Sequence, residues 1–305
     1  MKIYSSRYKH EPLPGKIVEG ALLRVHFGAW VEGYADLHPW EEFGDAPLNA
    51  QLASENSGIF AKSPYLAFVD AEARKKSRNL LRGLDLPSSH ALVDIANTSE
   101  VEKMRSQGFT HFKTKMGKNL ESETNALIRA PNVKWRLDFN AQLTEESFAK
   151  WWSALPSEAR SKIDLIEDPY GPVFGTPPPK VPGTFSKKVP GTVYSDWVSN
   201  DQWPGKVFKP ARDFSASLYQ ENRYPQILFT HALDHPLGQA AAIWEAGRFY
   251  QKYPALRQVC GFPEVAGFDD FYSAWNCKTS RRVPVPGLGF GFDELLQSLR
   301  WERVS

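Results

Sequence analysis

Residues 135–168 read WRLDFNAQLTEESFAKWWSALPSEARSKIDLIED, and this stretch contains one complete strand–helix–strand unit. WRLDFN (135–140) and IDLIED (163–168) are short, largely apolar runs of the kind that form buried strands. Between them, TEESFAKWWSAL has the spacing of an amphipathic helix. A helix between two short apolar strands is the repeating unit of parallel α/β proteins. The stretch therefore predicts an α/β fold with a parallel sheet.

The same unit recurs from residue 89 onward. Eight strand candidates follow one another: ALVDI (91–95), HFKTKM (111–116), WRLDFN (135–140), IDLIED (163–168), TVYSDW (192–197), KVFKPA (206–211), QILFTHA (226–232) and RQVCGF (257–262). Amphipathic helical stretches lie between most of them, and eight strands over roughly 200 residues favour a (β/α) barrel over an open sheet. Residues 170–191 are rich in Pro and Gly and predict an extended insertion, and the short link from TVYSDW to KVFKPA leaves no room for a full helix.

The first 88 residues have a different pattern. Residues 16–36 predict two short strands, LLRVHFG and WVEGYAD, joined as a hairpin. Residues 61–82 predict a helix with Ala and Leu on one side and Lys and Arg on the other. The turn-rich sequence GLDLPSS then marks a boundary, so we expect a small α+β unit before the barrel.

The composition excludes several classes of protein. With 24% charged and 42% hydrophobic residues the chain is globular and not disordered, and a net charge of +2 gives no indication of nucleic-acid binding. Two cysteines, Cys260 and Cys277, are too few for a disulfide framework and favour a reducing compartment. Because the sequence contains neither a signal-peptide core nor a run of 18 apolar residues, we expect a cytoplasmic protein without membrane contact.

Charged side chains occur at the ends of five consecutive strand candidates. They are Lys113, Lys115, Asp138, Glu167, Asp196 and Lys209, and the three carboxylates follow one another at intervals of 29 and 29 residues. In a barrel the carboxyl ends of the strands meet at one face, and adjacent strands are about 4.8 Å apart. The three carboxylates are therefore expected to converge.

Converging carboxylates repel one another and are costly to bury, so they need a counter-charge. Three carboxylates suit Mg²⁺, which prefers oxygen ligands and keeps positions for water and substrate. A lysine beside a cation and a second lysine has a lowered pKa, which suits a general base that removes a proton next to a carboxylate. Each group alone has a simpler interpretation as a helix cap, a surface ion pair or a solvated face, but these do not explain why all six lie at the same strand ends.

The charged motifs resemble those of the enolase superfamily, in the branch with lysines on both sides of the barrel. The resemblance rests on KTK (113–115), LDFN (137–140), IEDP (166–169), SD (195–196), FKPA (208–211) and EGYADLHPWEEFGD (32–45). Within this branch IEDP, KPA and PGLGFGF (286–292) are most similar to the o-succinylbenzoate synthase family. The resemblance spans nearly the whole chain.

The resemblance implies a modified (β/α)7β barrel at residues 89–286 under an α+β capping domain at residues 1–88, which residues 287–305 complete. It implies Mg²⁺ bound by Asp138, Glu167 and Asp196. The implied reaction is the syn dehydration of 2-succinyl-6-hydroxy-2,4-cyclohexadiene-1-carboxylate to 2-succinylbenzoate, a step of menaquinone biosynthesis.

Three lysines have implied catalytic roles. Lys115 would remove the proton α to the substrate carboxylate and then protonate the departing hydroxyl on the same face. Lys113 would contact the carboxylate and lower the pKa of Lys115. Lys209, across the site, would stabilise the enediolate in a dehydratase or act as the second acid/base in a racemase.

Substrate-binding residues are implied at Asn140, Thr230 and His231. Thr230 and His231 would bind the succinyl carboxylate, although His231 is equally interpreted as a packing residue. Residues 5–15 predict a mobile loop that closes over the site. Arg7 and Lys9 in that loop are interpreted as solvated, with contact to an acidic substrate as the alternative.

Two other classes of function stay open. The same lysines and carboxylates serve dipeptide epimerases, N-acylamino acid racemases and cycloisomerases of the superfamily. A non-catalytic binding protein on the same barrel is the other alternative, and the intact charged motifs argue against it. We expect a monomer that binds a small-molecule carboxylate and no nucleic acid.

Overall fold

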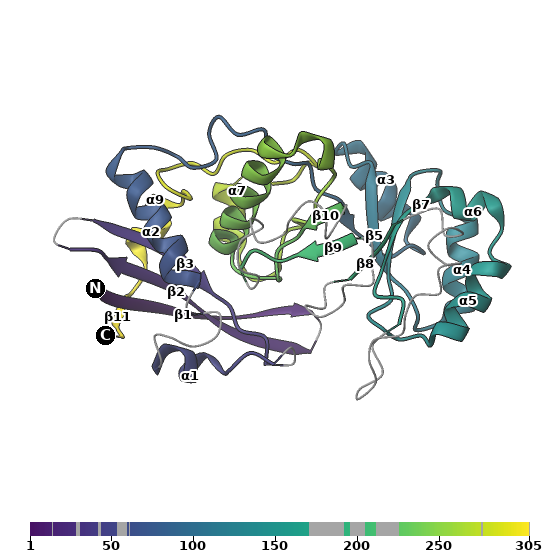
Figure 1. Cartoon of the computed structure of the whole chain (residues 1–305), viewed down its shortest axis with the longest axis horizontal. Coiled ribbons are helices and arrows are strands. Elements are labelled where there is room, and N and C mark those ends of the chain that lie inside the picture. Colours follow the sequence, from purple (N-terminus) through teal and green to yellow (C-terminus); the bar gives the residue numbers. More distant parts are fainter. Residues whose placement is uncertain are drawn as a thin grey trace.

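The computed structural model contains two sheets with helix α7 (Pro236–Lys252) between them (Figure 1). It describes residues 1–13, 15–28, 31–41, 44–53, 60, 62–170, 192–195, 205–211, 226–275 and 277–304. A four-stranded antiparallel sheet at one end holds the first and the last strand of the chain, and a seven-stranded parallel sheet lies at the other end. No helix within these ranges is both long and apolar enough to cross a membrane.

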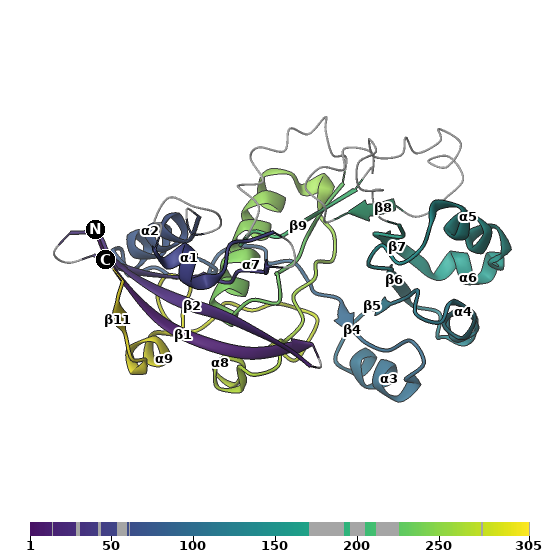
Figure 2. The same cartoon turned by 90° about the horizontal axis from the view of Figure 1, so that it is seen from below.

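The antiparallel sheet forms the cap and has the strand order β11-β1-β2-β3. Its strands are β1 (Lys2–Leu13), β2 (Lys16–His26), β3 (Glu32–Leu37) and β11 (Glu302–Arg303). Helix α2 (Lys62–Lys75) packs on β2 and β3, and α1 (Leu48–Ala53) contacts β2. Figure 2 shows β1 and β2 running side by side along this layer. The hairpin predicted for residues 16–36 is confirmed as β2 and β3.

The mobile loop predicted for residues 5–15 is wrong, because most of these residues belong to β1 and pair with β2. Arg7 donates to Asn49 Oδ1 at 2.7 Å, and Lys9 pairs with Glu19 on the neighbouring strand. Both side chains therefore have partners within the cap. The segment looks like a loop in the sequence because its buried positions include polar residues, among them Ser5 and His10, which hide the alternation of a strand.

The helix predicted for residues 61–82 is confirmed only as far as Lys75. Ser77 adopts a left-handed conformation with φ of 49°, and its N–H donates to the Arg74 carbonyl at 2.9 Å. A left-handed residue just after the last turn is a common way for a helix to end.

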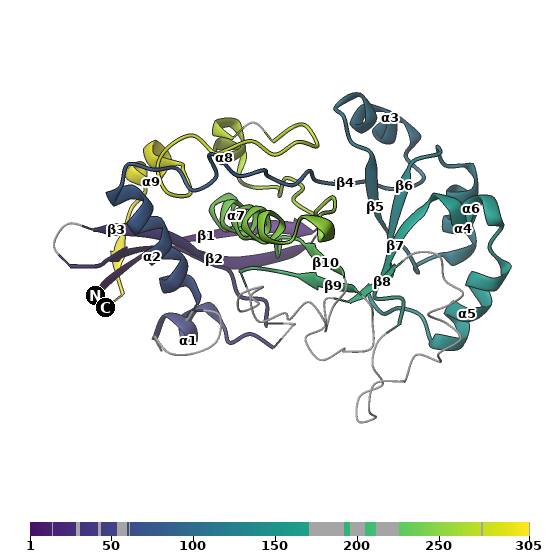
Figure 3. The ribbon, with the colours of Figure 1, turned by 45° about the horizontal axis from the view of Figure 1, so that its top comes forward.

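The parallel sheet contains seven strands in chain order, and all seven overlap predicted strands. They are β4 (Ala91–Leu92), β5 (His111–Lys115), β6 (Lys134–Asp138), β7 (Ile163–Glu167), β8 (Thr192–Ser195), β9 (Gly205–Phe208) and β10 (Gln226–Phe229). The helices that follow the early strands are α3 (Thr98–Ser106), α4 (Leu120–Arg129), α5 (Glu145–Ala154) and α6 (Ser157–Lys162), and they cover the outer face (Figure 3). The insertion at 170–191, apart from Tyr170, and the link at 196–204 lie outside the described residues.

Residues 260 and 261 close the ring of strands. Cys260 pairs in parallel with Ser89, just before β4, and Gly261 pairs in parallel with Thr230, just after β10. The N–H of His90 donates to the Cys260 carbonyl at 2.8 Å, and the N–H of Gly261 donates to Phe229 at 2.9 Å. The predicted strand at 257–262 is confirmed only at Cys260 and Gly261, and these two residues complete the predicted (β/α)7β barrel. Closure satisfies backbone groups that two free sheet edges would leave unpaired.

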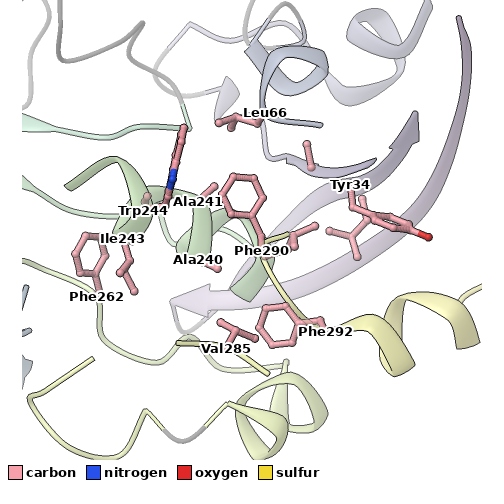
Figure 4. Packing of buried hydrophobic residues seen from close by; sticks show 14 of the residues in the cluster. Tyr34, Leu66, Ala240, Ala241, Ile243, Trp244, Phe262, Val285, Phe290 and Phe292 are labelled. Atoms are coloured by element: carbon pink, nitrogen blue, oxygen red, sulfur yellow. The ribbon is translucent and has the colours of Figure 1, made fainter. Parts of the chain in front are cut away.

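Helix α7 joins the two sheets through a large apolar cluster. It contacts both β3 of the cap and β10 of the barrel (Figures 1 and 3). Figure 4 shows Trp244 of α7 facing Phe290, with ring centroids 5.7 Å apart, and Val285 near Phe292. The segment 286–292 is followed by α9 (Asp293–Ser298) and by β11 in the cap sheet. Two shorter helical elements, η4 (Pro254–Leu256) and α8 (Asp269–Ala274), precede it.

Candidate functional site

The strand ends bring Lys115, Asp138 and Glu167 into one row. In the parallel register Lys115 on β5 lies opposite Asp138 on β6, and Asp138 lies opposite Glu167 on β7. Lys113 precedes Lys115 by two residues and so points to the same side of β5. Phe112, the residue before Lys113, points to the opposite side of β5 and is fully buried in the apolar cluster beneath the helices. The predicted inward direction of the two lysines agrees with this alternation.

The two lysines neutralise the two carboxylates. Lys113 Nζ lies 2.7 Å from Asp138 Oδ2 and 2.7 Å from Glu167 Oε2. Lys115 Nζ lies 2.7 Å from Asp138 Oδ2 and 2.8 Å from Asn140 Oδ1. The side chains of Asp138 and Glu167 are 3% and 5% exposed, whereas that of Lys115 is 45% exposed and reaches into open space. The site therefore combines a buried acidic centre with a half-exposed amine on Lys115.

The ion pairs keep the buried groups charged. Burial alone would raise the pKa of Asp138, but the Lys113 and Lys115 ammonium groups hold it below its ordinary value. Burial likewise opposes the ammonium form of Lys113, yet the carboxylates of Asp138 and Glu167 raise its pKa. That Lys113 tunes Lys115 for proton transfer stays a prediction.

Left-handed residues shape the loops that follow β6 and β7. Asn140, Ala141 and Asp168 have φ of 46°, 57° and 41°. The N–H of Asn140 donates to Asp138 Oδ1 at 3.1 Å, and the N–H of Ala141 donates to the Asp168 carbonyl at 2.7 Å. This turn sends the Asn140 side chain back toward Lys115. Non-glycine residues in this conformation are uncommon and concentrate at functional sites.

A pocket of about 600 Å³ contains every predicted site residue that the structure describes: Lys113, Lys115, Asp138, Asn140, Glu167, Lys209, Thr230 and His231. Cap residues Pro12, Lys16 and Trp40 also line it. The Trp40 indole donates to the Ala232 carbonyl at 2.7 Å, which ties the cap to the barrel at the rim of the pocket. The volume is in the range of small-molecule sites.

Sequence reasoning missed several groups in the pocket. His90, Lys16 and Trp40 line it but carry no pattern that separates them from packing residues. Asp234, which is not among the residues that line the pocket, was also missed; its Oδ1 lies 3.3 Å from His231 Nδ1, and both side chains are buried. This contact leaves both interpretations of His231 in place, since the residue packs and also lines the pocket.

The described residues offer two of the three predicted metal ligands, Asp138 and Glu167. Asp196 lies outside the described residues, and the described ranges contain no group of three or more side chains able to hold a metal ion. The donor chemistry fits a hard divalent cation, because both groups are carboxylates on adjacent strand ends and both already need positive charge beside them. The residues present are therefore compatible with Mg²⁺.

Known proteins are similar to this chain in sequence and in fold. The family model for the N-terminal domain of O-succinylbenzoate synthase matches residues 10–73. An o-succinylbenzoate synthase of Bdellovibrio bacteriovorus is 28% identical over 308 residues, which cover 94% of this chain and 91% of that protein. The barrel with an N-terminal cap recurs in solved structures. That of an o-succinylbenzoate synthase from Thermosynechococcus elongatus, complexed with magnesium in the active site, is 19% identical with a TM-score of 0.68, over 98% of this chain and 100% of that one.

A second solved structure is a dipeptide epimerase from Enterococcus faecalis, 15% identical with a TM-score of 0.69, covering 95% of this chain and 98% of that one. Its name states a different reaction from that of the synthase. The shared fold therefore does not identify the reaction, because the reaction depends on the residues of the pocket.

We predict that the two lysines differ in their effect on stability. In metal-free protein Lys113→Met should lower the free energy of unfolding by about 3–5 kcal/mol, because it removes one partner from a buried ion pair. Lys115→Met is the matched control and should cost about 1 kcal/mol or less, because that side chain is half exposed. Chemical denaturation followed by circular dichroism measures both values. Equal losses in the two variants would contradict the assigned role of Lys113.

Proposed function

We propose that the chain is an enzyme of the enolase superfamily, similar to o-succinylbenzoate synthases, and that it catalyses a Mg²⁺-dependent syn dehydration. The substrate is 2-succinyl-6-hydroxy-2,4-cyclohexadiene-1-carboxylate and the product 2-succinylbenzoate, an intermediate of menaquinone biosynthesis. The observation that carries the proposal is the pairing of Lys113 and Lys115 with Asp138 and Glu167 inside a capped pocket. The similarity to a synthase over 94% of the chain supports this reaction over others of the fold.

Asp138 and Glu167 would hold the cation together with Asp196. When bound, Mg²⁺ supplies positive charge for the substrate carboxylate, on which negative charge builds up as the α-proton leaves. The two described ligands lie on neighbouring strands, so they can face one ion. Their present partners are ammonium groups, which shows that the oxygens attract positive charge at this position.

Lys115 moves the proton. As the free amine it takes the α-proton from carbon and becomes an ammonium group. It then gives this proton to the hydroxyl. The C–O bond breaks with its electrons leaving on the water, and the electron pair of the former C–H bond forms the new ring double bond. The amine is restored, and no oxidant or reductant takes part. The exposed position of its Nζ, next to Asn140, suits a group that must reach the substrate from one face.

The other pocket residues bind the substrate and stabilise the negative charge that forms on it. Lys113, which lies beside Asp138 and Glu167, provides positive charge near the substrate carboxylate. Lys209 at the end of β9 contributes charge from across the pocket. Asn140 orients Lys115, and Thr230 and His231 contact the succinyl side chain.

Epimerisation is the second candidate, because a dipeptide epimerase has a similar fold and the pocket contains lysines on two sides. An epimerase needs a base on each face of the α-carbon, so Lys115 and Lys209 would both transfer protons. A dehydratase needs proton transfer only on the face of Lys115.

A panel assay tests the reaction. Purified protein with Mg²⁺ should convert the cyclohexadiene carboxylate to 2-succinylbenzoate, followed by its absorbance change, and should turn over dipeptides and N-acylamino acids far more slowly. Chelation should stop the reaction and added Mg²⁺ should restore it. Faster epimerisation than dehydration would replace the proposed function with the second candidate.

Variants of the lysines test the roles. Lys115→Ala should lower kcat for dehydration by about 10²- to 10⁴-fold, the usual contribution of general acid–base catalysis. Lys118→Ala is a control on the same segment, since Lys118 is exposed and not in the pocket, and it should leave kcat unchanged. Lys209→Ala should slow dehydration but leave proton removal by Lys115 in place. Exchange of the substrate α-proton for deuterium in D₂O measures this proton removal. Normal turnover in Lys115→Ala would rule out the assigned base.

A further inference from the structure

His90 is a buried group in the pocket that the proposed mechanism does not use. It is 2% exposed, lies just before β4 and lines the pocket. Its Nδ1 lies 3.1 Å from Nη1 of Arg136. A guanidinium group has donors only, so Nδ1 must accept this hydrogen bond. The proton of the neutral ring is then on Nε2, which makes that atom a donor.

The Arg136 side chain is itself fixed, which fixes the tautomer of His90. Arg136 is 1% exposed, its Nε donates to Asp164 Oδ2 at 2.7 Å, and its Nη1 also donates to the Val259 carbonyl at 2.8 Å. Burial first, then the charges of Arg136 and Lys113, lower the pKa of His90 well below its ordinary value. The ring is therefore neutral and presents one N–H.

Thr230, which also lines the pocket, provides a second polar group. Its Oγ1 is buried and has no hydrogen-bond partner among the described residues. The backbone of Thr230 pairs with Gly261, on the strand that closes the barrel. A Cβ atom on Gly261 would lie 2.7 Å from His90 Cε1, 2.7 Å from Thr230 Cγ2 and 3.0 Å from His90 Nε2. Because Gly261 has no side chain, the imidazole and the threonine side chain approach one point on the wall of the pocket.

The charges around this point are already balanced. Arg136 faces Asp164, and the two lysines Lys113 and Lys115 face the two carboxylates of Asp138 and Glu167. An uncharged oxygen acceptor would satisfy the two donors without adding an unpaired charge to a buried site. A carbonyl oxygen has this chemistry.

We propose that His90 and Thr230 form a two-donor subsite in the pocket that binds a ketone oxygen of the substrate. This inference rests on the proposed function, in which the ketone belongs to the succinyl side chain. The subsite then selects acyl-substituted rings over alkyl-substituted ones, and Gly261 keeps it open.

A ligand pair tests the subsite by titration calorimetry with Mg²⁺ present. One ligand is 2-succinylbenzoate and the other is 2-(3-carboxypropyl)benzoate, in which CH₂ replaces the ketone. The wild type should bind the ketone about tenfold more tightly, the effect of hydrogen bonds from two donors. In His90→Phe and in Thr230→Val this preference should fall to roughly threefold or less, since each variant removes one donor.

The comparison of two ligands separates the subsite from general damage. His90→Phe also removes an acceptor from Arg136, which weakens both ligands alike, whereas Thr230→Val leaves Arg136 untouched. Thr230→Ser keeps the hydroxyl and should keep the tenfold preference. Equal binding of the two ligands by the wild type overturns the subsite but not the proposed function. Binding of neither ligand overturns both.

Discussion

Two carboxylates on neighbouring strands can be buried at the mouth of this barrel only because an ammonium group lies between them. Lys113 contacts both Asp138 and Glu167 at 2.7 Å, and Lys115 adds a second positive charge on Asp138. Without these partners the acidic pair would repel and lose its hydration. Because the two carboxylates require positive charge beside them, they also suit a divalent cation. Lys113 lies largely buried between them, whereas Lys115 is half exposed. In the proposed chemistry the buried Lys113 supplies fixed charge and the exposed Lys115 transfers the proton.

The pocket depends on two further features of the fold. The pairing of Cys260 and Gly261 with the first and last parts of the sheet closes the barrel and brings β4 next to the wall that carries Thr230. The cap then supplies Pro12, Lys16 and Trp40 to the rim. Helix α7 holds both parts through apolar packing, so the cap and the strand ends are one unit at the site.

The sequence predicted the positions of the barrel strands because each is a short apolar run at a regular distance from the next, and such runs are typical of buried strands. It also predicted which charged residues end β5, β6 and β7, since parallel strands share one edge. It failed at β1, whose buried side includes polar Ser5 and His10, and at the end of α2, where a left-handed Ser77 has no clear signal. His90 could not be found, because its role depends on Arg136 and Gly261, which are distant in the sequence. The place of Asp196 stays a prediction.

The proposed cation site at the strand ends includes Asp138 and Glu167. Calorimetric titration of the metal-free protein with Mg²⁺ tests it most directly, with Asp138→Asn as the matched variant. We expect the wild type to bind one Mg²⁺ per chain and Asp138→Asn to lose at least tenfold in affinity, because a neutral amide replaces a charged ligand. Unchanged Mg²⁺ affinity in Asp138→Asn would contradict the account.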